Sequence, residues 1–116
     1  MRRRLKGTEG DLLGGTLDML ILSTLVRGAA HGFLIAQSIG ARSRDVLLVE
    51  EGSLYPALHR LTRQGFITSS WRVTETNRRA RYYALTAAGR RALTEEQATW
   101  ERLSHAVNLV MKMAPS

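Results

Sequence analysis

Arginine side chains concentrated in one stretch of the chain are the residues best suited to a chemical task, which is binding a polyanion. Residues 60–91 hold eight arginines against one glutamate, whereas residues 7–59 carry a net charge of −3. Fifteen of the seventeen cationic side chains are arginines, which fork onto phosphates and base edges more readily than lysines. Clustered cations bind a phosphate backbone by releasing its counterions. The pattern favours a nucleic-acid surface, and the alternative is an arginine-rich face that is merely solvated.

The residue patterns that catalysis or metal binding requires do not occur in the sequence. It contains no Gly-x-Ser-x-Gly elbow, phosphate-binding Walker loop or His-Glu-x-x-His motif. The three histidines, His31, His59 and His105, lack ligand spacing. Cysteine is absent, which excludes disulfides, thiolate metal sites and cysteine nucleophiles. We therefore expect a binding protein that is not an enzyme and that has no metal and no cofactor.

Length and composition fit one small domain. The chain has 116 residues, 44% of them hydrophobic, which suffices for one hydrophobic core. No apolar run approaches the roughly 20 residues that a membrane-spanning helix needs. Residues 1–6 continue into polar sequence without the apolar segment of a signal peptide. We expect a cytoplasmic protein that does not contact a membrane.

Two apolar helices are predicted ahead of the arginine-rich segment. The first has Thr16 as a suitable N-cap and stops at Gly28. Its apolar residues surround it almost completely, which on a small domain suggests that a second copy of the chain covers one side. The second helix begins at His31, whose position before a glycine suits a helix start, and ends near residues 40–43.

A third helix is predicted directly before the arginine-rich segment. Residues 46–49 precede it as either a short strand or a packed turn, since periodicity does not separate the two. Ser53 is a suitable N-cap, Pro56 fits the first turn, and Gly65 ends the helix. Its apolar residues repeat at helical spacing, so the opposite face is polar and available to a partner.

The period then changes to that of a β-hairpin followed by a long helix. Residues 66–75 and 81–85 alternate between apolar and polar side chains, and the tip between them is cationic. Trp71 is interpreted as hairpin packing. Thr86 can cap a final helix of about 25 residues. Along this helix a seven-residue apolar repeat indicates a seam for a partner, formed by Leu93, Trp100, Leu103, Val107 and Val110.

This order of elements predicts a mainly α (α+β) fold, a winged helix-turn-helix with a long C-terminal dimerisation helix. Residues 1–13 are expected to be a flexible basic N-terminal arm, residues 14–86 the DNA-binding domain, and residues 87–116 the dimerisation helix. The predicted homodimer interface combines the last helix with the first and comprises Leu17, Leu20, Ile21, Leu93, Trp100, Leu103, Val107 and Val110.

The candidate DNA-binding residues lie on the third helix and the hairpin. Ser53, His59 and Arg63 are expected to reach base edges in the major groove. Phosphate contacts are expected from Tyr55 and from the hairpin arginines. Pro56 either packs at the helix start or touches DNA. The complete predicted set is Ser53, Tyr55, Pro56, His59, Arg60, Arg63, Arg78, Arg79 and Arg81.

An ordered set of motifs resembles the PadR family of transcriptional regulators. The set consists of GTLDMLIL at 15–22, HGF at 31–33, EGSLYPALHRL at 51–61, Gly65 and RYYALTAAG at 81–89. The resemblance spans roughly residues 14–103. It implies a dimeric bacterial repressor that binds an inverted-repeat operator in double-stranded DNA and is often released by a small aromatic effector. It also implies that Tyr55 and Pro56 lie on the recognition helix and residues 78–81 on the wing.

The sequence departs from the family pattern at the second helix and beside the wing tip. Phe33 stands where the family usually has tyrosine, which removes a hydroxyl and should leave packing intact. Ala80 replaces a common proline, so the tip is expected to be looser. Glu50 and Glu51 suit the positive end of the third helix but repel phosphate, so we expect them to point away from DNA.

Trp100 is the candidate ligand-binding residue. In multidrug-sensing relatives, a tryptophan on the last helix stacks on planar drugs between the subunits, and the stretch WERL at 100–103 resembles theirs. The alternative is that Trp100 is plain interface core. Two rival functions also stay open. One is a winged-helix module that binds protein and not DNA, and the other is a repressor controlled without an effector.

Overall fold

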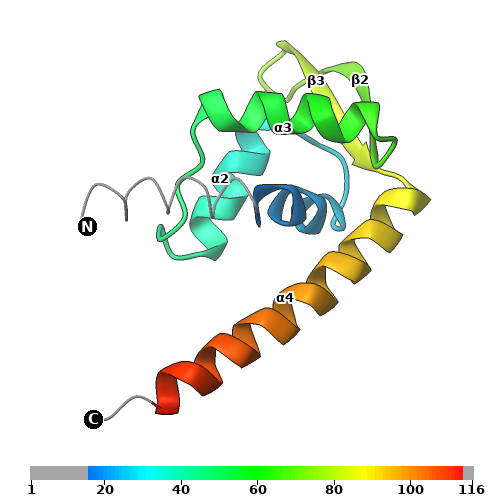
Figure 1. The fold of residues 1–116 in the computed structure, drawn as a ribbon. Helices are drawn as coiled ribbons and strands as arrows, with labels where there is room; N and C mark the ends of the chain where they lie inside the picture. The colour runs from blue at the N-terminus through cyan, green and yellow to red at the C-terminus, as the bar shows by residue number, and fades with distance from the viewer. Residues whose placement is uncertain (1–15, 114–116) are drawn as a thin grey trace.

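The computed structural model describes residues 16–113, and its elements follow the predicted order (Figure 1). The predicted basic arm, residues 1–13, lies outside this range. The first helix covers residues 16–25 and is followed by six labelled elements. These are β1 (Ala30–His31), α2 (Gly32–Arg42), α3 (Glu51–Arg63), β2 (Ile67–Val73), β3 (Arg79–Leu85) and α4 (Ala87–Met113).

Helix α2 begins where the sequence predicts, because His31 caps it. The Nδ1 atom of His31 accepts a hydrogen bond from the backbone N–H of Leu34 at 3.2 Å. The segment after α2 forms a turn, and residues 46–49 are not a strand. Leu47 and Val49 pack partly against the core, whereas Val46 and Leu48 are exposed. Within this turn, Ser43 Oγ accepts from the N–H of Leu47 at 3.0 Å, and the backbone of Asp45 has a positive φ of 64°.

Helix α3 begins three residues earlier than predicted, which corrects the roles of two residues. Glu50 is the N-cap and makes no side-chain capping hydrogen bond, so Ser53 lies inside the first turn and is not the cap. Pro56 consequently lies in the second turn, where it cannot donate to the carbonyl of Gly52. Gly52 is exposed, so water can reach that carbonyl. The helix therefore tolerates the proline at a solvent-facing position.

The hairpin belongs to a three-stranded antiparallel sheet with the order β1-β3-β2. The two-residue strand β1 was not predicted, because two residues carry no periodic signal. It pairs Ala30 with Tyr83 and His31 with Tyr82, which fixes the start of α2 against the hairpin. At the tip, Thr74 Oγ1 accepts from the N–H of Arg78 at 3.2 Å.

The core lies between the first helix, α2, α3 and the sheet, and it corrects part of the predicted dimer interface. Leu17 is 2% exposed, Ile21 0% and Leu93 6%, so these side chains have almost no surface left for a partner. The first helix is apolar nearly all round because its own chain surrounds it. Leu93 completes the same core from the first turns of α4. The interface prediction was therefore wrong for Leu17, Ile21 and Leu93, while Leu20 is only half-buried.

Helix α4 contacts the winged-helix body, residues 16–86, at its first turns and then extends away from it (Figure 1). The predicted cap at Thr86 is confirmed, since its Oγ1 accepts from the N–H of Gly89 at 3.0 Å and donates to the carbonyl of Gly65 at 2.7 Å. Gly89 packs directly on the carbonyl of Phe66, with no room for a Cβ atom. Among residues 16–113, no helix is long and apolar enough to cross a membrane.

Candidate nucleic-acid interface

Helix α3 separates a buried apolar face from an exposed face that carries most of the predicted contact residues. Leu54, Ala57, Leu58 and Leu61 lie in the core. The exposed side chains recur three or four positions apart, so they share one side of the helix. The residues on this side are Ser53, Tyr55, Pro56, His59 and Arg63. The structure thus brings five predicted residues onto one surface that a DNA groove can reach.

Tyr55 connects this face to the start of α2. Its side chain is 44% exposed, and its ring lies over Gly32. A Cβ atom added at Gly32 would come within 2.8 Å of the Tyr55 hydroxyl oxygen. Glycine at this position therefore allows α2 and α3 to approach each other with Tyr55 between them. Tyr55 therefore packs against α2 while part of its side chain stays exposed.

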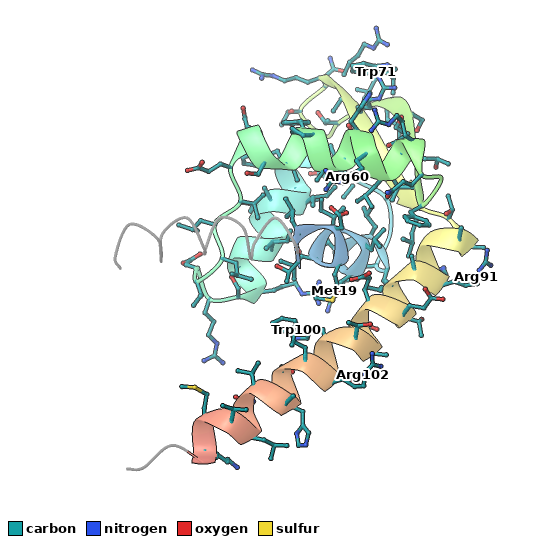
Figure 2. The ribbon with its side chains drawn as sticks, in the orientation of Figure 1. Met19, Arg60, Trp71, Arg91, Trp100 and Arg102 are labelled. Atoms are coloured by element: carbon teal, nitrogen blue, oxygen red, sulfur yellow. The ribbon has the colours of Figure 1, made fainter. Side chains whose placement is uncertain are left out.

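Arg60 lies at the flank of α3 and pairs with a carboxylate of its own chain, so its DNA contact stays a prediction. Its Nη2 atom lies 2.5 Å from Oδ1 of Asp18, and its Nε donates to Oδ2 of Asp18 at 3.4 Å. This ion pair joins α3 to the first helix (Figure 2). Sequence reasoning missed it because the partners are 42 residues apart. Arg63, one turn further along, is exposed.

The hairpin presents the three predicted wing arginines, each in a different setting. Arg78 lies at the tip, and Arg79 and Arg81 lie on β3. The Nε of Arg81 donates to Ser69 Oγ across the strands at 3.1 Å. Neighbouring Tyr83 is buried, and burial raises its pKa above the ordinary value, although the charge of Arg81 opposes the rise. All three arginines are exposed, so the wing is cationic as predicted.

Two hairpin side chains, Trp71 and Arg72, have surroundings that the sequence did not indicate. Trp71 packs within the hairpin as interpreted, but on its exposed side: it is 55% exposed and its ring is contacted by arginines of β3. Arg72 was not selected, yet it is exposed, and its guanidinium lies 5.1 Å from the centre of the Tyr82 ring. Strand alternation, which places residues 71 and 72 on opposite faces, is the signal that could have distinguished them.

Beyond Leu93, which is buried in the core, the predicted seam on α4 is exposed. The exposed fractions are 44% for Trp100, 54% for Leu103, 49% for Val107 and 69% for Val110. Their places in the dimer interface, and the ligand contact of Trp100, stay predictions. Glu51 lies in the first turn of α3 and lines a groove between α2 and α3, so its orientation relative to DNA also stays a prediction. The described residues contain no cluster of His, Asp and Glu that could hold a metal ion.

A helix-turn-helix with a polar exposed third helix, followed by a cationic hairpin, defines a winged-helix protein. The model of the PadR-like family of transcriptional regulators matches residues 21–95. The chain therefore belongs to the PadR-like family of transcriptional regulators, and the resemblance predicted from the sequence motifs is confirmed. Membership in this family makes the protein a transcriptional regulator and not an enzyme.

Individual relatives agree with this assignment. The transcriptional regulator Rv3488 of Mycobacterium tuberculosis is 39% identical over 87 residues, covering 75% of this chain and 78% of that protein. A PadR family transcriptional regulator from Eggerthella lenta matches with a TM-score of 0.79 and 30% identity, over 97% of this chain and 96% of that one. A transcriptional regulator from Clostridium thermocellum matches with the same TM-score and identity, over 90% and 99%.

Proposed function

We propose that the protein is a homodimeric, sequence-specific DNA-binding repressor that acts in the bacterial cytoplasm. The observation that carries this proposal is the placement of α3 and the hairpin. Both lie on the side of the body that is remote from the free end of α4 (Figures 1 and 2). The exposed face of α3 enters the major groove, and the wing arginines contact the adjacent backbone.

A dimer explains why one molecule carries both this surface and α4. A helix-turn-helix dimer places its recognition helices about 34 Å apart, one turn of DNA, so its operator is an inverted repeat. The exposed seam of α4 provides the surface through which two copies associate, and half-buried Leu20 of the first helix is a further candidate contact. The separation of the two α3 helices is then set by how the α4 helices pack.

Release by an effector is the second part of the proposal. Trp100 is 44% exposed and lies on the seam, where a planar aromatic molecule can stack between two copies. Such a molecule weakens DNA binding only as far as it prefers the arrangement that misfits the operator. In Trp71→Phe, Trp100 is the only tryptophan of the chain, so its fluorescence reports on this site. Quenching by planar aromatics supports effector binding, whereas unchanged emission favours control without an effector.

Selection of bound duplexes from a random pool tests DNA recognition directly. We expect an enriched palindrome whose half-sites are about one helical turn apart. Failure to retain any duplex at low salt would overturn the proposal and favour the rival winged-helix module that binds protein. Enrichment of a single non-palindromic half-site would retain DNA recognition and remove the proposed symmetry.

A further inference from the structure

The exposed tryptophan of the hairpin lies against two of the wing arginines. The guanidinium carbons of Arg79 and Arg81 lie 5.1 and 5.4 Å from the centre of the Trp71 ring. In the register of the hairpin, Arg81 is directly opposite Trp71, and Arg79 is opposite Val73, two pairs further toward the tip. The three side chains therefore share one face of the hairpin, because strand residues two apart point the same way.

Burial in the core does not explain why a tryptophan occupies position 71. The same face carries Ile67 and Tyr83, which are 1% and 7% exposed and belong to the core. At Trp71, which is 55% exposed, the strands have passed beyond that core (Figure 2). The ring instead lies beneath two cations that repel each other, and its negative π face attracts both. Arg81 is fixed further by its hydrogen bond to Ser69.

The other hairpin arginines lack this arrangement. Arg72 lies on the opposite face, over the ring of Tyr82, which in turn meets His31 edge-on with ring centres 5.3 Å apart. Arg78 lies at the tip, where the turn orders its backbone through Thr74. The hairpin thus separates two arginines ordered by Trp71 from two that are independent of it.

We propose that Trp71 is a positioning residue that orders Arg79 and Arg81 before a duplex arrives. The inference rests on the proposed DNA binding and goes further, because it assigns the ordering of the wing to one side chain. A long side chain that is immobilised only on binding reduces affinity through its lost rotamer entropy. With both guanidiniums held on the ring, their rotamer entropy is lost before DNA binds. The phosphate contacts then form without that reduction in affinity.

The affinity of variants for a duplex distinguishes ordering of the arginines by Trp71 from direct contact between Trp71 and DNA. Trp71→Leu should weaken duplex binding by roughly three- to tenfold, the effect of ordering one to two side chains at the interface. The slope of log K against log salt should stay unchanged, because the arginines still reach the same phosphates. Trp71→Phe keeps an aromatic face and should recover most of the affinity. Replacing Arg79 and Arg81 with alanine should instead lower the slope by about one unit per lost contact.

A double-mutant cycle, read by fluorescence anisotropy with a labelled duplex, tests the proposal. In the background that lacks Arg79 and Arg81, Trp71→Leu should have no further effect. In the matched Arg72→Ala background, it should keep its full effect. A loss that persists without Arg79 and Arg81 would show that Trp71 acts on DNA or on the hairpin itself, and would overturn the inference.

Two further outcomes are decisive. Equal affinity of Trp71→Leu and the unmodified chain would overturn the inference and leave the proposed function intact. Absence of duplex binding by the unmodified chain at low salt would overturn both. Thermal unfolding controls for folding, and we expect little change because Trp71 is exposed at the end of the hairpin.

Discussion

In the winged-helix body, the first helix and α3 each bury an apolar face in the core, where Ile21 and Leu58 are fully buried. Beyond Leu93 in α4, by contrast, Trp100 and Val107 keep 44% and 49% of their surface exposed. The first helix and α3 thus each bury an apolar face within their own chain, although Phe33 and Val46 elsewhere in the body stay exposed. Beyond Leu93, the apolar stripe of α4 has no partner among the described residues. Under the proposed function, DNA contact and self-association reside in separate regions, so mutations should affect one without the other.

The largest expected effect is the loss of self-association in Val107→Asp. The charge enters the proposed seam from both copies, and an unpaired buried charge costs about 3–5 kcal/mol. Sedimentation equilibrium should show monomers. Leu109→Asp is the matched control, because Leu109 is similarly exposed at 52% but lies about 200° around the helix from Val107. Dimers that survive Val107→Asp and dissociate in Leu109→Asp would move the interface to the other face of α4.

The next largest effect concerns the wing. Replacing Arg78, Arg79 and Arg81 with alanine should weaken binding to all duplexes alike and lower the salt slope by about one unit per lost phosphate contact. The dimer should remain. Replacing Arg90, Arg91 and Arg102 with alanine removes the same charge from exposed positions of α4 and should change the slope far less. Equal salt slopes for both triple variants would show that the wing arginines act only through the total charge of the protein.

The junction between the two regions depends on Gly89. A Cβ atom there would overlap the carbonyl oxygen of Phe66 and lie 2.8 Å from Leu85 Cδ1. Gly89→Ala should therefore destabilise the fold by about 1–3 kcal/mol, measured by urea unfolding. Gly52→Ala is the control, because a Cβ atom at this exposed helical position meets nothing within 4 Å. It should stabilise the protein by about 0.5–1 kcal/mol. Equal stability of the two variants would contradict the close approach at Gly89.

His59 tests whether the exposed face of α3 reads bases. His59→Ala should change the preference among operator sequences by about 1–3 kcal/mol at the base pair it contacts, with little effect on random duplexes. Competition binding with single-base operator variants measures this change. Equal losses on operator and random DNA would identify His59 as a backbone contact.

The smallest effect is expected at the ion pair between Arg60 and Asp18. Their side chains are 41% and 31% exposed, so solvent screens the attraction, and a double-mutant cycle should give a coupling of only about 0.2–1 kcal/mol. Because Arg60 is paired with Asp18, Arg60→Ala should also reduce DNA affinity less than Arg63→Ala does. A larger loss from Arg60→Ala would show that the ion pair opens on DNA.

Local chemistry made much of this structure predictable. His31 and Thr86 were recognisable as helix starts because their side chains can accept hydrogen bonds from the following turn. Strand alternation located the hairpin. The exposed face of α3 followed from the spacing of its apolar residues.

Contacts between distant residues were not predictable in the same way. Nothing local to Asp18 indicates Arg60, and the two residues of β1 are too few to show a period. An apolar helix surrounded by its own chain has the same pattern as one covered by a partner, which is why Leu17 and Ile21 were misplaced. The stacking of arginines on Trp71 depends on the hairpin register, which the sequence pattern alone leaves open.

Sedimentation velocity of the protein mixed with its selected duplex tests the central claim most directly. At low salt, two copies of the chain should sediment with one duplex, and added salt should release them as a dimer. A chain that sediments as a monomer, apart from the duplex even at the lowest salt, would contradict it.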